Sequence, residues 1–327
     1  MRKPVWNMSW IFAGIVASAS FSVFDSFAQS YPSKPIRLIA GQAPGGSTDV
    51  TSRMVGQKLS ELLGQAVIVE NRIGAAGAIA AERVALSPPD GYTLLVLVNG
   101  HTVLPSLRAK PPYDLERDFS PVSLMALGAA VLTIHPSVPA RNVKELVALA
   151  RENPGKLTYG TSGIGGTTHL MGELFSMLSK VKLSHVPYKG SALSAIATVA
   201  GEIDIGFLDI TVTLPLVKSG KLRALAVTTL KRTALMPSVP TLDESGLKGY
   251  DYAGWYGLIG PAGVPKDIIA RLNAAIDKVV NTPAMAESMS KQGLTPQTNS
   301  PEEFMAFIRA KVAKSAELIK VAGLKAK

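Results

Sequence analysis

The sequence predicts an α/β protein of two lobes, because short apolar runs alternate with amphipathic segments along most of the chain. Two glycine-rich turns, at 41–49 and 160–169, each follow a short apolar run and open a helix-like pattern. A strand that delivers glycines and hydroxyls to a helix N-terminus presents free backbone N–H groups, which suit an anion. Since the turns lie in separate halves of the chain, we expect two lobes that hold one small anion between them.

Strands and helices alternate in the first half in the order β-α-β-α-β, over 36–40, 48–63, 66–70, 77–86 and 93–98. Apolar residues of the segment 48–63 recur at helical spacing, and Gly64 follows them as a C-cap. The pair Asp90-Gly91 marks the turn before the last of these strands. This order implies a parallel sheet that is covered on both faces.

The second half repeats the plan, with strands predicted over 130–135, 156–160, 182–187, 203–208 and 222–227 and helices over 142–152, 168–178 and 191–200. The tail from Pro265 to Lys327 has helical patterns only, and Ser300-Pro301-Glu302-Glu303 opens its last helix. A tail without strands must pack on an existing sheet. We therefore expect a discontinuous first lobe over 29–128 plus 251–327, a second lobe over 129–250, and a hinge of two crossing segments near 127–130 and 249–256.

The N-terminus reads as a secretory signal peptide over 1–28. Arg2 and Lys3 precede an apolar stretch over 10–24, and Ser26-Phe27-Ala28 supplies small residues before a cut near Ala28-Gln29. The apolar run is too short, and too interrupted by Ser and Gly, for a membrane anchor. Export to a bacterial periplasm is the predicted location, and the total lack of cysteine excludes disulfides and lipid attachment to a thiol.

The formal net charge of +10 does not point to nucleic acid. The positive residues are scattered, no basic run interleaves with aromatic residues, and an exported protein seldom meets nucleic acid. The charge therefore indicates a mild field that favours anions, together with ordinary solvated helix faces. We expect a monomer without a cofactor.

The first turn combines backbone access with hydroxyl donors. Gly45 and Gly46 let backbone approach a ligand without an obstructing Cβ, and Pro44 sets the direction of the chain. Ser47 or Thr48 can cap the helix or offer a hydroxyl to a ligand. The pattern lacks the lysine of a P-loop and the spacing of the dinucleotide fingerprint, so a nucleotide is not expected. A plain strand–helix connection is the alternative.

The second turn is richer in donors, at Thr161, Ser162, Gly165, Gly166, Thr167 and Thr168. Neutral donors at this density suit a carboxylate that is held by hydrogen bonds without a fixed cation. His169 lies in the first turn of the following helix, where it either contacts a ligand or is a hydrogen-bonded structural histidine. A flexible loop is the alternative for the whole segment.

Three further loops follow predicted strands, Asn99-Gly100-His101-Thr102, Tyr188-Lys189-Gly190-Ser191 and Asp209. Open α/β sheets bind ligands at the carboxyl ends of their strands, so these loops are candidates. Tyr188 offers a phenol donor, while Lys189 is either a cation for the ligand or a solvated loop charge.

Catalysis is not expected. A Ser-His-Asp catalytic triad could in principle be assembled from Ser162, His169 and Asp209. However, no serine lies in a Gly-x-Ser-x-Gly nucleophile elbow. The histidines at 101, 135, 169 and 185 lack the spacing of a metal site.

A series of ordered motifs resembles one family. They are Tyr31-Pro-Ser-Lys-Pro-Ile36, Ala43-Pro-Gly-Gly-Ser-Thr-Asp49, Val69-Glu-Asn-Arg72, Pro89-Asp-Gly-Tyr-Thr-Leu94, His185-Val-Pro-Tyr-Lys-Gly-Ser191, Gly220-Lys-Leu-Arg-Ala-Leu-Ala226, Pro237-Ser-Val-Pro-Thr241 and Trp255-Tyr-Gly-Leu-Ile-Gly-Pro-Ala262. The mature chain is similar, over essentially its whole length, to the periplasmic solute-binding components of tripartite tricarboxylate transporters, the Bug family.

The resemblance implies a type II periplasmic-binding fold that closes two lobes on a small carboxylate, held largely by backbone and hydroxyl donors. Carried over by position, the ligand contacts fall on Gln42, Pro44, Gly45, Gly46, Ser47, Thr48, Asn99, His101, Thr161, Ser162, Gly165, Gly166, Thr167, Thr168, His169, Tyr188, Lys189, Gly190, Ser191 and Asp209.

Three departures from the family pattern bear on the ligand. Gly41-Gln42 stand where a proline and an aromatic residue usually precede the first turn, Ile210 stands where asparagine is common, and Asn99-Gly100-His101 replaces a small-hydroxyl loop. Gln42 in place of an aromatic residue could admit a bulkier or more polar ligand.

The expected function is therefore capture of a small carboxylate and its delivery to the membrane subunits of a tripartite transporter. Two alternatives stay open at this point. One is an orphan sensor-type binder whose partner is a signalling receptor, and the other is a periplasmic hydrolase.

Overall fold

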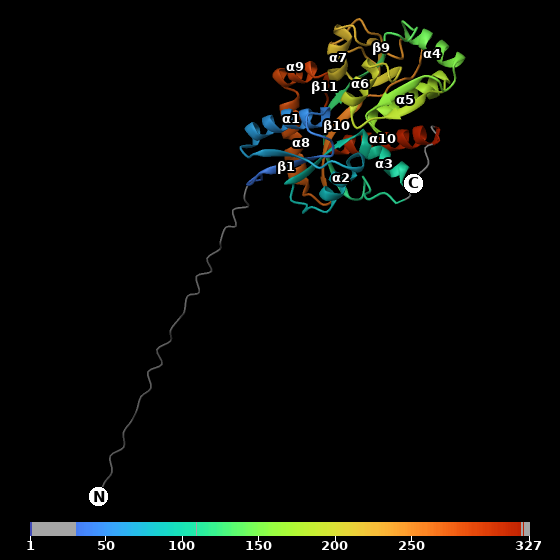
Figure 1. Ribbon diagram of the computed structural model, residues 1–327. Helices are drawn as coiled ribbons and strands as arrows, with labels where there is room; N and C mark the ends of the chain where they lie inside the picture. The colour runs from blue at the N-terminus through green and yellow to red at the C-terminus, as the bar shows by residue number, and fades with distance from the viewer. Residues whose placement is uncertain (2–30, 109, 322, 324–327) are drawn as a thin grey trace. The chain divides into compact units, whose positions relative to one another are not determined.

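Two β-sheets organise the chain in the computed structural model, which describes residues 1, 31–108, 110–321 and 323. Residues 2–28 of the predicted signal peptide lie outside the described residues. From Pro32 onward the chain forms one compact unit, within which each sheet has its own set of helices (Figure 1).

The first sheet has the strand order β11-β4-β10-β3-β1-β2. Its strands are β1 (Ile36–Ala40), β2 (Val67–Asn71), β3 (Thr93–Val98), β4 (Phe119–Gly128), β10 (Gly254–Pro261) and β11 (Leu294–Pro296). β1 pairs in parallel with both β2 and β3, as the β-α-β-α-β order predicts. β10 is antiparallel to β3 and β4, so the sheet is mixed.

The second sheet has the order β7-β6-β8-β5-β9. Its strands are β5 (Ala130–Ile134), β6 (Thr158–Thr161), β7 (Ser184–Pro187), β8 (Ile205–Asp209) and β9 (Arg223–Val227). β6 lies parallel to β7 and β8, while β5 runs antiparallel to β8 and β9. The carboxyl ends of β6, β7 and β8 therefore meet at one edge, which places three of the predicted loops together.

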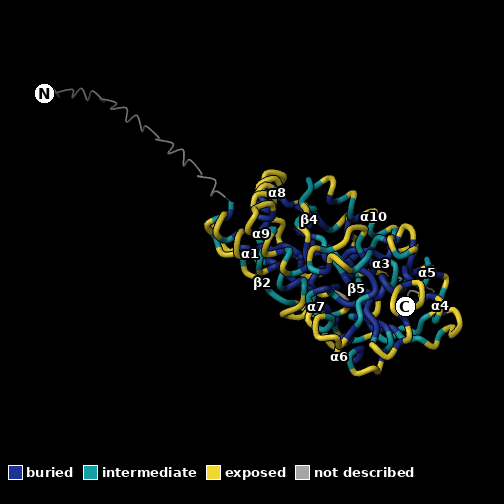
Figure 2. The backbone as a smooth tube through the Cα atoms, turned by 90° about the horizontal axis from the view of Figure 1, so that it is seen from above, coloured by how far each residue is buried: buried dark blue, intermediate teal, exposed yellow. Residues whose placement is uncertain are grey.

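Helices cover both sheets. They are α1 (Ser47–Leu63), α2 (Ala78–Ala85), α3 (Asn99–Leu107), α4 (Val143–Glu152), α5 (Thr167–Ser179), α6 (Ser191–Val199), α7 (Ile210–Lys218), α8 (Lys266–Val280), α9 (Pro283–Lys291) and α10 (Pro301–Val321), with a short 3₁₀ turn at Ala75–Gly77. α1 packs beside α8, and α2, α3 and α10 share a core with β3 and β10. The strands are largely buried and the outer helix faces exposed (Figure 2).

The two sheets are joined by two crossing segments, and hydrogen bonds involving the residues beside them hold them close together. One is the single residue between β4 and β5, and the other is the segment 228–253 between β9 and β10. The Thr228 amide donates to the Ala130 carbonyl at 3.0 Å, the Tyr252 amide donates to the Thr228 carbonyl at 2.9 Å, and Gly254 pairs with Gly128. The two-lobed α/β fold with a hinge of two crossings is confirmed.

The expectation of a strand-free tail is wrong, because β11 pairs antiparallel with β4 at the edge of the first sheet. β11 has three residues, which is too short to show a period of two in sequence. Asn99 begins a helix where a loop was expected, and Ile210 begins another directly after Asp209.

The last helix contacts both lobes. Phe304 and Ile308 of α10 belong to the core of the first sheet, whereas Leu318 and Ile319 belong to the core around the second sheet. Between them, Lys314 donates from Nζ to the Asp251 carbonyl in the second crossing at 2.8 Å. α10 therefore packs against both lobes beside the hinge. In the described part of the chain, no helix combines the length and the apolar character that a membrane crossing requires.

Substituting Gly257 tests the packing of α10 on β10. A Cβ at Gly257 would overlap the Phe304 ring, so we expect Gly257→Ala to lower the free energy of unfolding by about 1–3 kcal/mol. The matched control is Gly254→Ala on the same strand, where the nearest atom to the new Cβ is the Gly128 carbonyl oxygen at 3.5 Å. Equal stability of the two variants in urea denaturation would contradict this packing.

Candidate functional site

The two glycine-rich turns follow the same backbone path. Gly45 and Gly165 are left-handed, with φ of 77° and 72°. Gly46 and Gly166 cap α1 and α5 with φ/ψ of −76°/167° and −72°/166°. In each turn the capping glycine amide donates to the carbonyl three residues earlier, at 3.3 Å and 3.1 Å. The sequence predicts two anion turns, and the structure shows that they are one motif built twice.

A side chain at the third helical position holds each turn. The Gly45 amide donates to Asp49 Oδ2 at 3.0 Å, and the Gly165 amide donates to His169 Nδ1 at 3.0 Å. Because Nδ1 of His169 accepts, the proton of the neutral ring is assigned to Nε2, which lies 3.5 Å from Glu173 Oε1. Asp49 and His169 therefore both accept a hydrogen bond from the left-handed glycine of their turn, one through a carboxylate and the other through an imidazole nitrogen.

These anchors leave the leading amides of both helices uncommitted. Within residues 31–108 and 110–321, the N–H groups of Ser47, Thr48, Thr167 and Thr168 have no acceptor. A helix N-terminus carries partial positive charge and suits an anion such as a carboxylate.

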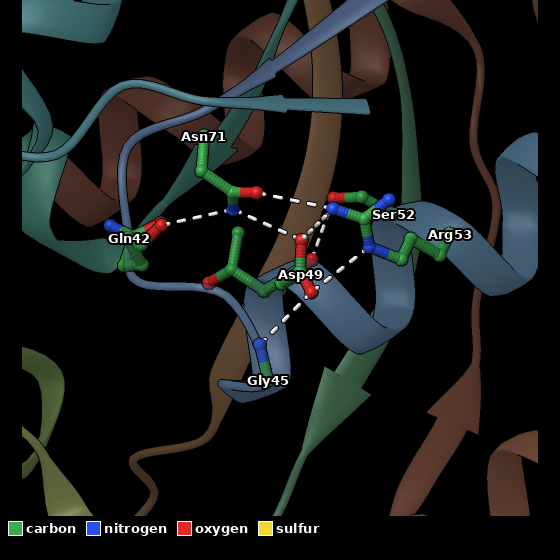
Figure 3. A network of polar contacts seen from close by, with 7 residues as sticks. Gln42, Gly45, Asp49, Ser52, Arg53 and Asn71 are labelled. Carbon is green, nitrogen blue, oxygen red and sulfur yellow. Dashed lines mark hydrogen bonds and ion pairs between the residues drawn. The ribbon is translucent and has the colours of Figure 1, made fainter. Parts of the chain in front are cut away.

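The first turn is fixed by a network around Asp49 (Figure 3). Asn71 donates from Nδ2 to Asp49 Oδ1 at 3.0 Å and to the Gln42 carbonyl at 3.1 Å, and Arg53 donates from Nε to Asp49 Oδ2 at 3.0 Å. Burial alone would raise the pKa of Asp49, but hydrogen bonds from Arg53, Gly45 and Asn71 outweigh it and lower that pKa. The carboxylate stays ionised and keeps the turn in place.

The second turn rests on a stack of three rings, of which His169 and Tyr159 are buried and His185 is half-buried. The His169 and His185 rings stack with centroids 3.9 Å apart, and Tyr159 stacks on His185 at 4.9 Å. Thr161 Oγ1 lies 2.7 Å from His185 Nε2, and the Tyr159 hydroxyl donates to Glu173. Burial, followed by the nearby His169, lowers the pKa of His185 to about 4.

The triad of Ser162, His169 and Asp209 is not assembled. Ser162 Oγ pairs with Thr168 Oγ1 at 2.9 Å, and the two ring nitrogens of His169 face Gly165 and Glu173. His169 is therefore not positioned to act as a base on Ser162. The described residues also contain no cluster of three metal-ligating side chains.

Asp209 ends β8, and the groups that act on the pKa of its carboxyl come from both lobes. They are Ser47, at the start of α1, and Ser191, at the start of α6. Burial raises the pKa of Asp209, while the Ser191 and Ser47 hydroxyls lower it. Burial, and then the charge of Asp209, raise the pKa of Tyr256 in β10. The sequence analysis did not single out Tyr256 as a candidate site residue. Its signal in the sequence was the aromatic pair Trp255-Tyr256, in a motif near the second crossing.

Two predicted loop residues contact their own lobe and the crossing. Asn99 Oδ1 accepts from the Trp255 amide at 3.0 Å, and its Nδ2 donates to the Ala253 carbonyl at 3.3 Å. His101 is fully buried, its Nδ1 accepts from the Val98 amide at 3.1 Å, and burial lowers its pKa to about 4. Both side chains support the end of β3 from inside.

The remaining predicted residues lie around the second turn and on the first. The Tyr188 amide donates to the Thr161 carbonyl at 3.0 Å, Lys189 is exposed, and Gly190 caps α6 with φ of 121°. Pro44 is exposed on the first turn. Ile210, one of the departures, packs in a core with Val131, Val227 and Met236, and its side chain abuts Gly293.

Truncating Asp49 tests the anchor of the first turn. We expect Asp49→Ala to lower the free energy of unfolding by about 1–3 kcal/mol, because the Gly45 amide and Arg53 lose their acceptor. Asp49→Asn keeps an acceptor oxygen and is expected to lose less. Equal losses for Ala and Asn in chemical denaturation would show that the oxygen does not hold the turn.

The lowered pKa values of two histidines predict a pH dependence of stability. His101 and His185 each have a pKa of about 4 in the folded protein against an ordinary value of 6.5. Between these values the unfolded chain binds more protons, so the free energy of unfolding falls as the pH is lowered from 6.5 towards 4. The limit is about 1.4 kcal/mol per pH unit for each histidine. We expect His185→Gln and His101→Gln each to flatten this slope; wild-type slopes in both would refute the assignment.

The chain matches the model of a known family over residues 51–324, described as the tripartite tricarboxylate transporter family receptor. Among solved structures, the periplasmic binding protein BugD is 33% identical, with a TM-score of 0.80 over 91% of this chain and 100% of that one. R. palustris Rpa4515 with adipate is 32% identical, with a TM-score of 0.84 over 91% and 100%.

A third solved structure is MatC from Rhodopseudomonas palustris with bound malate. It is 28% identical, with a TM-score of 0.79 over 88% of this chain and 100% of that one. The α/β fold of two sheets described above is thus the fold of periplasmic binding proteins. The chain belongs to the tripartite tricarboxylate transporter receptor family, a family of periplasmic solute-binding proteins that includes the Bug proteins.

Proposed function

We propose that this chain captures a small carboxylate between its two lobes and delivers it to the membrane subunits of a tripartite tricarboxylate-type transporter. The observation that carries the proposal is the repeated turn, with two uncommitted amides at each helix N-terminus. Export to the periplasm through the signal peptide 1–28 and action as a monomer are parts of the same proposal.

A carboxylate matches these donors in charge and geometry. Its two oxygens can accept from the amides of Ser47 and Thr48 on one lobe and of Thr167 and Thr168 on the other. The helix dipoles favour the charge, so no fixed cation is needed. A ligand that bridges both turns gains its full set of hydrogen bonds only when the lobes are closed, and it therefore shifts the population towards the closed form.

Two further observations support a carboxylate. The adipate and malate bound by Rpa4515 and MatC are small dicarboxylates. Asp209, Ser191 and Tyr188 lie at the ends of β8 and β7, beside the second turn, where they can complete the site. The lobe boundaries 29–128 plus 251–327 and 129–250 are part of the proposal; the two separate sheets support them, while α10 contacts both cores.

A thermal-shift screen against mono-, di- and tricarboxylates, amino acids and aromatic acids tests the proposal. A ligand that binds only the folded chain adds about 2.7 kcal/mol of stability at a concentration of 100 times Kd. We expect at least one carboxylate to raise Tm in a concentration-dependent way. No shift with any carboxylate would overturn the proposed function.

Proline substitutions at the first helical position test the amides directly. Ser47→Pro and Thr167→Pro each remove one N–H, and the extended Gly46 and Gly166 before them accept a following proline. We expect each variant to weaken binding of the carboxylate found in the screen by at least about tenfold, the effect of one lost charge-assisted hydrogen bond.

Alanine variants separate the contribution of the backbone amide to ligand binding from that of the side-chain hydroxyl. Ser47→Ala and Thr167→Ala lose the hydroxyl but keep the N–H, so they should bind more tightly than the proline variants. Lys266→Pro, at the exposed first position of α8, is the control for proline at a helix N-terminus and should leave Kd unchanged. Proline and alanine variants of equal affinity would show that the amides do not hold the ligand.

A further inference from the structure

The second turn is held by an acceptor that can take up a proton. The Gly165 amide donates to Nδ1 of His169 at 3.0 Å, whereas the Gly45 amide of the first turn donates to a carboxylate oxygen of Asp49 at 3.0 Å. A neutral imidazole nitrogen accepts a hydrogen bond, but the same nitrogen becomes a donor once it is protonated. A proton on Nδ1 would therefore set two donors against each other at the second turn, and it has no counterpart at the first.

An ionised carboxylate lies on the other side of the His169 ring. Nε2 of His169 is 3.5 Å from Oε1 of the half-buried Glu173, which also accepts from the Tyr159 hydroxyl. Burial alone would raise the pKa of Glu173, but hydrogen bonds from His169 and Tyr159 outweigh it and lower that pKa. Glu173 can therefore balance the charge of an imidazolium at His169.

The neighbouring ring does not compete for this proton. His185 stacks on His169 with centroids 3.9 Å apart, a separation at which two charged rings repel each other. Burial, followed by the charge of His169, lowers the pKa of His185 to about 4, and among the described residues Glu173 is the other charged group that acts on it. Above that pH the pair takes up a single proton, and the carboxylate beside Nε2 favours His169 as its place.

Uncharged groups pack around the pair from other elements. Phe207 of β8 packs edge-on against Tyr159, Leu107 of α3 lies beside Gly165, and Leu318 of α10 belongs to the same core. The geometry of the second turn therefore depends on the protonation state of one ring.

We propose, building on carboxylate binding between the lobes, that His169 is a positioning residue that makes capture depend on pH. Its neutral ring fixes Gly165, and through the cap at Gly166 it holds the amides of Thr167 and Thr168 in place for the ligand. Its protonated ring loses that hydrogen bond and lets the turn move. The first turn keeps its anchor over the same range, so acid weakens the grip of the second lobe alone.

An asparagine at position 169 separates the acceptor from the proton. Its Oδ1 is as many bonds from the backbone as Nδ1 of histidine, and it accepts without titrating. Asp49, at the same helical position of the first turn, shows that a side chain of this length reaches the glycine amide.

The measurement is the Kd of the carboxylate found in the screen, by calorimetry from about pH 8 to about pH 5.5, the range in which an imidazole titrates. We expect the Kd of the wild-type protein to rise about five- to tenfold towards acid, the effect of one lost hydrogen bond. His169→Asn should bind with a nearly constant Kd. Protonation of the ligand itself affects both proteins equally, so the difference between the two profiles reports on His169.

His135→Asn is the matched control, because it makes the same substitution at a histidine whose Nδ1 lies 2.6 Å from the Ser137 hydroxyl, after the end of β5 and outside this cluster. It should keep the wild-type pH profile. A wild-type profile in His169→Asn, or tighter binding in acid by the wild-type protein, would overturn the inference.

A measurement without ligand does not depend on the variant folding. In nitrogen–proton correlation spectra of the ligand-free wild-type protein, the amide resonance of Gly165 should move as the pH is lowered over this range, while that of Gly45 stays nearly constant. A Gly165 resonance that does not respond refutes the inference. Absence of binding by every carboxylate refutes the proposed function and pH-dependent capture together, whereas binding with a flat pH profile refutes this inference alone.

Discussion

The hydrogen bond from a left-handed glycine to the side chain at the third helical position is the contact on which the site depends. Gly45 donates to Asp49 and Gly165 donates to His169, both at 3.0 Å. A residue with a Cβ is strained at φ near 75°, so each turn needs its glycine. With the turn tied back in this way, the first helical amides find no acceptor among the described residues and stay available to an anion.

The hinge and α10 constrain how these two turns can approach each other. Next to the crossings, Thr228 bonds to Ala130 and Gly254 pairs with Gly128, so the crossings are tied together and are not two independent linkers. α10 places Phe304 in one core and Leu318 in the other, and it fixes the second crossing through Lys314. Movement of one lobe must therefore repack the end of α10, which favours a few discrete arrangements over continuous bending.

Much of the fold and of the candidate site follows from local sequence signals. The two turns could be predicted because glycines, hydroxyls and the helical period lie together within a few residues. The sequence did not predict β11, because a strand of three residues is too short to show an alternation of apolar and polar residues. Tyr256 was also missed, because Ser47 and Asp209, which act on the pKa of its hydroxyl, are distant from it in sequence. Asn99 and His101 were predicted as ligand contacts from their position after a strand; their observed partners are backbone groups, which only the folded chain reveals.

The repeated turn also shows how one geometry can be stabilised by two chemistries. Asp49 is an acceptor because it is ionised and held by Arg53 and Asn71, and a proton on one oxygen would still leave the other free to accept. His169 is an acceptor only while Nδ1 carries no proton, and the His185 ring stacks on it with centroids 3.9 Å apart. The glutamate and tyrosine below the stack fix the tautomer through Nε2. Tyr159, Glu173 and His185 therefore form the cluster that supports the second turn.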